Sequence, residues 1–259
     1  MNLRGKTVWL TGASSGIGAA LAPALAAKGA DLILSARRED ELRRVADAVG
    51  GARIEPIDLA DTAQLAPRAR QILERSGGID LVIHNAGISQ RSFVRDTSIE
   101  VYERLMRVNY LGPVALTTTI LPSLVERRGQ IVVVSSVVGR FGSPLRSGYS
   151  GSKHALHGFF DSLRAEHARD GLKVTIICPG FVSTDISKNA LTGDGRPLGT
   201  LDSRTARGLS AEVCAAKMIR AIERETEEAH IGGSEAHAVL LKRLFPRLFS
   251  WMLARAKVT

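Results

Sequence analysis

The amino-acid sequence predicts an α/β fold in which a doubly wound parallel sheet carries helices on both faces. Apolar runs rich in β-branched residues alternate along the chain with longer amphipathic runs. The apolar runs are continuous rather than alternating, as expected for strands that helices cover on both faces. The repetition of strand, helix and strand, with no composition break and no internal repeat, favours one parallel-sheet domain.

Seven short apolar runs and six longer amphipathic runs make up this pattern. The strand candidates are Thr7–Leu10, Asp31–Ser35, Arg53–Ile57, Asp80–His84, Gln130–Ser135, Lys173–Cys178 and a short run near His230 and Ile231. The helix candidates are Gly16–Lys28, Asp40–Val49, Thr62–Arg75, Ser98–Glu126, Gly148–Arg169 and Ala211–Glu225. A chain of 259 residues is long enough for one large domain and short for two. We expect a domain over residues 1–235 and a basic C-terminal segment over residues 236–259.

Composition and charge exclude several classes of protein. No run approaches the roughly 20 uninterrupted apolar residues that span a bilayer, and no signal peptide is recognisable, so a cytoplasmic protein is expected. The two cysteines lack paired spacing, which predicts neither a disulfide framework nor a metal site. The net charge is +9, but aromatic residues make up only 5% and no binding motif occurs, so no nucleic-acid partner is expected.

A glycine-rich turn joins the first strand to the first helix. Glycine lets the backbone approach a pyrophosphate closely, and the N–H groups at a helix start attract anions. The alternative is an ordinary turn, but the order of strand, turn and helix favours dinucleotide phosphates. The phosphate-binding candidates are Gly12, Ser14, Ser15, Gly16, Ile17 and Gly18.

The end of the second strand carries two arginines, Arg37 and Arg38, and no carboxylate before Glu39. In this fold an acid at that position binds a ribose 2′-hydroxyl, whereas an arginine accommodates a 2′-phosphate. A guanidinium also matches phosphate geometry. The sequence therefore predicts NADP over NAD, with two solvated arginines as the alternative.

Tyr149 and Lys153 lie four residues apart near a helix start, so both project from one face of the helix. A nearby cation lowers the pKa of a phenol towards catalytic use. The spacing alone is common, but further motifs occur in order: Asn85-Ala86-Gly87 after the fourth strand, Asn109 in a long helix, Ser135-Ser136 after the fifth strand and Pro179-Gly180 after the sixth. With these motifs the chain resembles the single-domain short-chain dehydrogenases/reductases, from about Lys6 to about Gly233.

The resemblance implies a Rossmann-type sheet of seven strands and a set of residue roles. Tyr149 would be the general acid/base, and Ser136 would hydrogen-bond the same carbonyl oxygen. Lys153 would hold the nicotinamide ribose and lower the pKa of Tyr149. Asn109 would support a water that links Lys153 to bulk solvent.

The resemblance also implies a cofactor cleft. Beyond the glycine loop, the two arginines, Tyr149 and Lys153, its lining residues would be Asp58, Leu59, Asn85, Ala86, Gly87, Val108, Pro179, Gly180, Val182 and Thr184. Many NADP-preferring relatives carry a basic residue where this chain has Ser15. NAD therefore remains a weaker alternative cofactor.

Two further segments bear on the substrate. Residues 187–208 contain Gly193, Gly195, Pro197 and Gly199, which predicts a flexible loop; in the family this is the substrate lid. Five arginines in or near the predicted substrate region would attract an anionic substrate, although solvated side chains are favoured: Arg140, Arg146, Arg196, Arg204 and Arg207.

The C-terminal segment holds five basic residues and no acid between His237 and Thr259, which is +5 of the net +9. Its apolar residues recur at near-helical spacing: Leu240, Leu241, Leu244, Phe245, Leu248, Phe249 and Met252. It either packs on the cleft or a neighbouring subunit, or rests on an anionic membrane surface. We favour packing slightly, and expect the segment to serve a bulky apolar substrate.

Together these observations predict an NADP-dependent oxidoreductase that moves a hydride between the nicotinamide and a carbonyl or secondary alcohol of an apolar, lipid-like compound. The nearest alternative is a β-ketoacyl thioester reductase. A non-catalytic NADP-binding regulator is the alternative of another class. Family members usually pair through their long helices, which implies a homodimer or homotetramer.

Overall fold

The computed structural model describes residues 1–233 and 238–255 and confirms the predicted parallel sheet. Its seven strands lie in the order β3-β2-β1-β4-β5-β6-β7, all parallel. The strands are β1 (Thr7–Thr11), β2 (Asp31–Ser35), β3 (Arg53–Ile54), β4 (Leu81–His84), β5 (Gln130–Val134), β6 (Lys173–Pro179) and β7 (Glu228–Ile231). The order reverses between β1 and β4, which places a crevice at their carboxyl ends.

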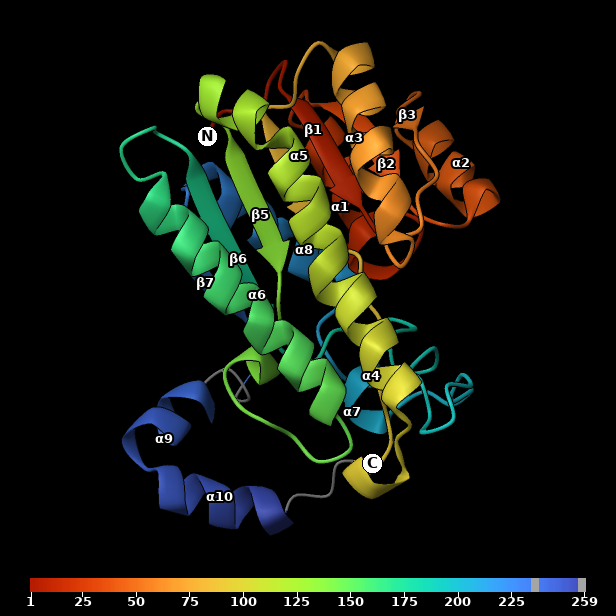
Figure 1. The fold of residues 1–259 in the computed structure, drawn as a ribbon, viewed down its shortest axis with the longest axis vertical. Helices are drawn as coiled ribbons and strands as arrows, with labels where there is room; N and C mark the ends of the chain where they lie inside the picture. The colour runs from red at the N-terminus through yellow and green to blue at the C-terminus, as the bar shows by residue number, and fades with distance from the viewer. Residues whose placement is uncertain (234–237, 256–259) are drawn as a thin grey trace.

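Helices cover both faces of the sheet (Figure 1). One face carries α1 (Gly16–Ala26), α2 (Glu39–Ala48) and α8 (Ala211–Glu223). The other carries α3 (Thr62–Ser76), α5 (Gly112–Glu126) and α6 (Ser147–Glu166). These helices agree with the predicted ones to within three residues at each end, apart from the interrupted helix described below.

Successive side chains of β1, an inner strand of the sheet, enter two different cores. Val8 and Leu10 pack with α1 and α8, while Trp9 packs with α3, α5 and α6. Because successive residues of a strand point to opposite faces, a strand buried on both faces must be apolar throughout. The Trp9 indole N–H donates to the Ser35 hydroxyl at 2.8 Å, so the largest buried side chain keeps its polar atom paired.

Two predicted elements differ from the observed ones. The third strand was expected over Arg53–Ile57 but is regular only over Arg53–Ile54, although the N–H groups of Glu55 and Ile57 still donate to the carbonyls of Leu34 and Ala36 at 2.9 and 3.1 Å. The helix expected over Ser98–Glu126 is divided into α4 (Ile99–Met106), a π-helical turn over Arg107–Leu111, and α5. Pro113 follows this turn and cannot continue the helical hydrogen bonding.

Among the described residues, the run Ile99–Glu126 is the one helical stretch long and apolar enough to cross a membrane, with 28 residues and a mean hydropathy of 1.3. Within this fold, however, its second half, α5, packs its apolar side chains against α3 and the sheet. Core packing therefore accounts for the apolar composition of that half.

The predicted lid is packed on the domain rather than loose. Leu191 is buried and forms isolated bridges with Gln90 and Pro197, and a short helix, α7 (Ser203–Ala206), follows. The loop composition predicted neither feature. Asp202 caps the start of α7, and its side chain accepts hydrogen bonds from the N–H groups of Arg204 and Thr205.

The C-terminal segment forms α9 (Ala238–Leu244) and α10 (Pro246–Arg255) below the carboxyl ends of the strands (Figure 1). Phe249 is buried against Phe141 with ring centroids 5.1 Å apart, and Lys242 donates to the carbonyl of Arg140 at 2.9 Å. The opposite side exposes a row of apolar residues: Leu240, Leu244, Phe245, Leu248, Trp251 and Met252. The boundary predicted between residues 235 and 236, and Lys257, lie outside the described residues.

Candidate active site

A cleft of about 590 Å³ opens at the carboxyl ends of β1 and β4, where the strand order reverses. It brings together most of the predicted site. The predicted residues that line it are Gly12, Ser14, Ser15, Gly16, Ile17, Arg37, Arg38, Asp58, Leu59, Asn85, Ala86, Gly87, Val108, Ser136, Tyr149, Lys153, Pro179, Gly180, Val182 and Thr184. Gly18 and Asn109 do not line the cleft. Gly18 packs against the Gly12 carbonyl, and Asn109 bonds the backbone of Ile88.

The glycine loop is held by close backbone contacts. A side chain at Gly12 would place its Cβ 2.6 Å from the Cα of Ala86, and one at Gly18 would place it 2.1 Å from the carbonyl oxygen of Gly12. The Asn85 amide donates to the carbonyls of Thr11 and Gly12, each at 3.1 Å, which fixes the turn. Ser15 makes no side-chain cap, so the first N–H groups of α1 lack a helical partner beside the cleft.

The far end of the cleft carries the two arginines that follow β2. Arg37 and Arg38 are exposed, and neither forms an ion pair within the described part of the chain. The carboxylate of Asp58 accepts a hydrogen bond from the N–H of Ala60 at 2.9 Å. A dinucleotide with a phosphorylated ribose fits this donor set: glycine backbone and helix N–H groups at one point, and two free guanidiniums further along.

Tyr149 and Lys153 both project from the first turns of α6 into the cleft. Both are buried, and the Lys153 ammonium lies 5.8 Å from the centre of the Tyr149 ring. Ser136, at the end of β5, hydrogen-bonds Tyr149 and donates to the carbonyl of Pro179 at 3.3 Å. The three side chains predicted to carry the chemistry therefore meet at one point.

The charges around Tyr149 differ from the expectation. Burial raises the pKa of the Tyr149 phenol, while the Ser136 hydrogen bond and the positive charges of Arg146 and Arg91 act to lower it. Lys153 was expected to supply the lowering charge, but it is itself desolvated, which lowers its pKa to about 8, and its ammonium donates to the carbonyl of Val134 at 2.7 Å.

Asn109 lies in the π-helical turn, fully buried behind Gly87. It bonds both backbone groups of Ile88, accepting from the N–H at 2.8 Å and donating to the carbonyl at 2.9 Å. A Cβ built on Gly87 would lie 3.3 Å from the Lys153 nitrogen and 3.4 Å from the Asn109 oxygen. The glycine therefore keeps open the small space between these two side chains.

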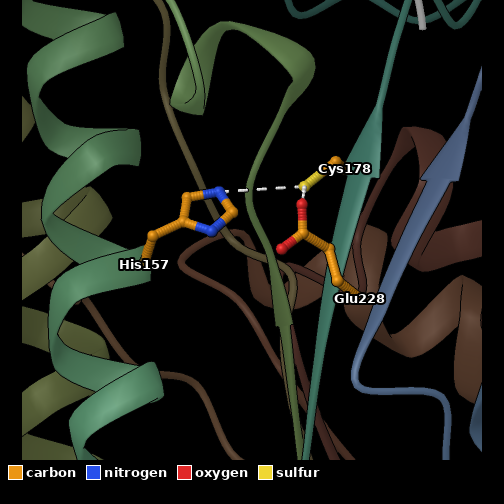
Figure 2. A group of neighbouring side chains, drawn as sticks. All are labelled: His157, Cys178 and Glu228. Carbon is orange, nitrogen blue, oxygen red and sulfur yellow. Dashed lines mark hydrogen bonds between the residues drawn. The ribbon is translucent and has the colours of Figure 1, made fainter. Parts of the chain in front are cut away.

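A buried cluster of His157, Cys178 and Glu228 lies behind Lys153, and its three polar groups face one another (Figure 2). The His157 ring bonds Ser135 at 2.9 Å, and the Cys178 thiol lies within reach of both partners, 3.7 and 3.9 Å away. Burial raises the pKa of Cys178 to about 12 and lowers that of His157 to about 4, so both stay uncharged. Arg140 already neutralises Glu228, and the cluster is a hydrogen-bonded network.

The sequence did not reveal that two arginines are buried beside Tyr149. Arg91, which was not predicted, and Arg146, which was predicted to be solvated, both line the cleft and share the carboxylate of Asp202. Their partner lies 111 and 56 residues away in the chain, so no local pattern indicates the pairing. Of the other arginines expected near the substrate, Arg140 pairs with Glu228 and Arg196 with Asp194.

Comparison with known proteins identifies the family of the chain. The family model described as short chain dehydrogenase matches residues 6–194. The chain belongs to the short-chain dehydrogenase/reductase family. It is 42% identical over 265 residues to a "Dehydrogenase/reductase SDR family protein 7-like" of Anopheles gambiae, covering 98% of this chain and 84% of that relative. The match makes the chain an oxidoreductase of this family.

Solved structures of short-chain dehydrogenases have the same fold. A short chain dehydrogenase from Burkholderia cenocepacia in complex with NADP is 25% identical, with a TM-score of 0.81, and the match covers 98% of this chain and 99% of that one. A short-chain dehydrogenase/reductase from Burkholderia phymatum in complex with NAD has a TM-score of 0.80 over 100% of this chain and 98% of that one, and at 24% identity it shows the fold alone.

Proposed function

We propose that this short-chain dehydrogenase/reductase uses NADP to interconvert a carbonyl and a secondary alcohol, with Tyr149 as general acid/base. The observation that carries the proposal is the meeting of Tyr149, Ser136 and Lys153 in the same cleft as the glycine loop and two unpaired arginines. When bound, NADPH supplies the hydride.

The protein's own groups handle the proton and the carbonyl oxygen. Since burial raises the pKa of Tyr149, the phenol is protonated at neutral pH and can donate its proton to the oxygen of a carbonyl undergoing reduction. The Ser136 hydroxyl hydrogen-bonds the same oxygen. Arg146 and Arg91 stabilise the phenolate that is left, because their charges lower the cost of ionising Tyr149. Lys153 holds the ribose beside the tyrosine.

The preference for NADP over NAD rests on Arg37 and Arg38. Both line the cleft, and neither forms an ion pair with any described residue, so a 2′-phosphate would meet two available guanidiniums. Replacing both with alanine should raise the KM for NADPH at least tenfold and leave that for NADH nearly unchanged. Equal effects on the two nucleotides would contradict this assignment.

We also propose that the substrate has a bulky apolar part. An apolar cluster beside Tyr149 contains Val137, Val138, Phe141 and Leu191, and Phe249 of α10 belongs to it. Of these residues Leu191 lines the cleft itself, and the C-terminal helices pack against the apolar cluster from outside the cleft. A variant truncated before Ala236 should lose activity on long-chain carbonyls; full activity in that variant would refute a role for the tail.

The enzyme is further proposed to form a homodimer or homotetramer through α4, α5 and α6. Size-exclusion chromatography with light scattering measures the oligomeric state, and a monomer at assay concentration would contradict it.

The test of the function is NADPH oxidation followed spectroscopically. Aldehydes and ketones of graded chain length, a steroid ketone and a β-ketoacyl thioester form the panel, with NADH and Tyr149→Phe as controls. We expect turnover that requires NADPH and vanishes in Tyr149→Phe. Preference for the thioester would favour the β-ketoacyl reductase. Tight NADPH binding without turnover would favour a regulator, and no nucleotide binding would refute the proposal.

A further inference from the structure

Arg91 and Arg146 form a pair of buried guanidiniums beside the catalytic tyrosine. Their side chains are only 9% and 10% exposed, and both line the cleft next to Tyr149. Arg91 follows the turn after β4, while Arg146 immediately precedes α6. The reactive end of the cleft therefore carries positive charge that belongs to the protein itself.

One carboxylate is shared by these two charges. The Oδ2 atom of Asp202 accepts hydrogen bonds from Nη2 of Arg146 at 3.1 Å and from Nη2 of Arg91 at 3.5 Å. Its other oxygen, Oδ1, accepts hydrogen bonds from the N–H groups of Arg204 and Thr205 in α7. Two cations and one anion leave a net charge of +1, in a place where an unbalanced buried charge is costly. Burial lowers the pKa of Arg91 only to about 10, so the guanidinium stays charged at neutral pH.

Both guanidiniums also have unused donors. The Nε atoms of Arg91 and Arg146 are buried without a hydrogen-bond partner among the described residues. The Nη1 group of Arg91 donates to the Ser89 hydroxyl at 2.9 Å and to the carbonyl of Gln90 at 2.8 Å. These two hydrogen bonds fix the orientation of the guanidinium. Arg146 lies over the ring of Phe181, with its central carbon 5.6 Å from the ring centre. The two side chains are therefore held in place. With Asp202 they carry one more positive than negative charge, and their Nε groups have no acceptor within the part of the chain that the structure describes.

We propose that Arg91 and Arg146 are a subsite for an anionic group on the substrate, a carboxylate or a phosphate monoester, located next to Tyr149. The inference deepens the proposed function and rests on it for calling the bound molecule a substrate. An anion there would balance the net charge of the pair, which lines the cleft. Since Phe181, Ile186 and Leu191 line the same cleft with apolar surface, the substrate class is an anionic amphiphile with a carbonyl or alcohol group.

Calorimetric titration with simple amphiphiles tests the subsite without needing turnover. Octyl phosphate and octanoate are the two anionic probes, and octanol is the neutral one, each titrated with and without NADPH. Charge-assisted hydrogen bonds should make at least one anion bind about tenfold or more tightly than octanol. The tighter of the two anions identifies the group. Equal binding of octanol and both anions would overturn the proposal.

Arg91→Met is the decisive variant, because it leaves Arg146 and Asp202 as a balanced pair. It should remove the preference for anions. The matched control is Arg95→Met, since Arg95 is exposed and lies outside the cleft, and it should keep the preference. If Arg91→Met does not fold, Arg91→Lys keeps the charge without the planar fork, and a several-fold loss of preference is then expected. An unchanged preference in the folded Arg91 variant would overturn the proposal.

Failure of the subsite and failure of the proposed function give different results. Tyr149→Phe should abolish turnover yet retain the Arg91-dependent preference for anions. Absence of turnover in the wild type, combined with that preference, would refute the oxidoreductase assignment and leave the anion subsite standing. NADPH-dependent turnover with no anion preference would support the oxidoreductase assignment and refute the anion subsite.

Discussion

Replacing Lys153 with methionine should stabilise the fold at neutral pH while it abolishes activity. Burial lowers the pKa of Lys153 from 10.5 to about 8, and one unit corresponds to about 1.4 kcal/mol. Holding the charged lysine therefore costs the folded state about 3 kcal/mol below pH 8. The variant loses the 2.7 Å hydrogen bond to the carbonyl of Val134, worth about 1 kcal/mol. The net stabilisation is about 2 kcal/mol, or roughly 5 °C in Tm.

The pH dependence of this difference gives a sharper test. Between about pH 8 and pH 10.5 the unfolded lysine keeps its proton and the folded one has lost it, so wild-type stability rises with pH across that window. Lys153→Met lacks this rise, and its advantage should disappear near pH 10. Urea unfolding near pH 7 and near pH 10 measures the difference, with the exposed Lys173→Met as a matched control. A variant that is less stable at neutral pH, or an advantage that does not change with pH, would refute the reasoning.

Three further substitutions test other parts of the structure. Gly18→Ala places a Cβ 2.1 Å from a backbone oxygen of the glycine loop, which cannot move alone, so NADPH binding measured by fluorescence should be lost. Asp202→Asn leaves two buried guanidiniums without a carboxylate and should cost about 3 kcal/mol or more in urea unfolding near neutral pH. Phe249→Ala removes the ring that seats α10, so trypsin should cleave the tail about tenfold faster while unfolding of the sheet stays unchanged.

Most of the fold could be predicted because its signals are local. Strand β2 has the predicted bounds Asp31–Ser35, since three buried apolar residues, Leu32–Leu34, lie between an exposed aspartate and a buried serine. The π-helical turn at Arg107–Leu111 was not predicted: Pro113 is a local signal beside it, but the accompanying close approach to Leu59 is a tertiary contact that no local pattern shows. A Cβ on Gly112 would lie 2.8 Å from the side chain of Leu59, so the chain must approach that loop closely at this point.

In the candidate site too, the residues that belong to short motifs could be predicted and those that meet through tertiary contacts could not. Tyr149, Lys153 and the glycine loop each belong to a short motif, so the sequence named them before their arrangement was known. Arg91 and Asp202 belong to no motif, and they meet only because the segment after β6 folds back over the cleft. The sequence also could not show which cations act on Tyr149, since that depends on which side chains lose their water.

The C-terminal helices are joined to Lys153 by a path of polar contacts. Lys242 of α9 bonds the carbonyl of Arg140, whose guanidinium holds Glu228. Glu228 meets the buried cysteine and histidine of Figure 2, and that histidine bonds Ser135, whose hydroxyl donates to the carbonyl of Lys153. The tail is thus part of the scaffold behind the reaction centre. Displacing α9 would therefore disturb contacts that lead to Lys153, although no residue of α9 lines the cleft.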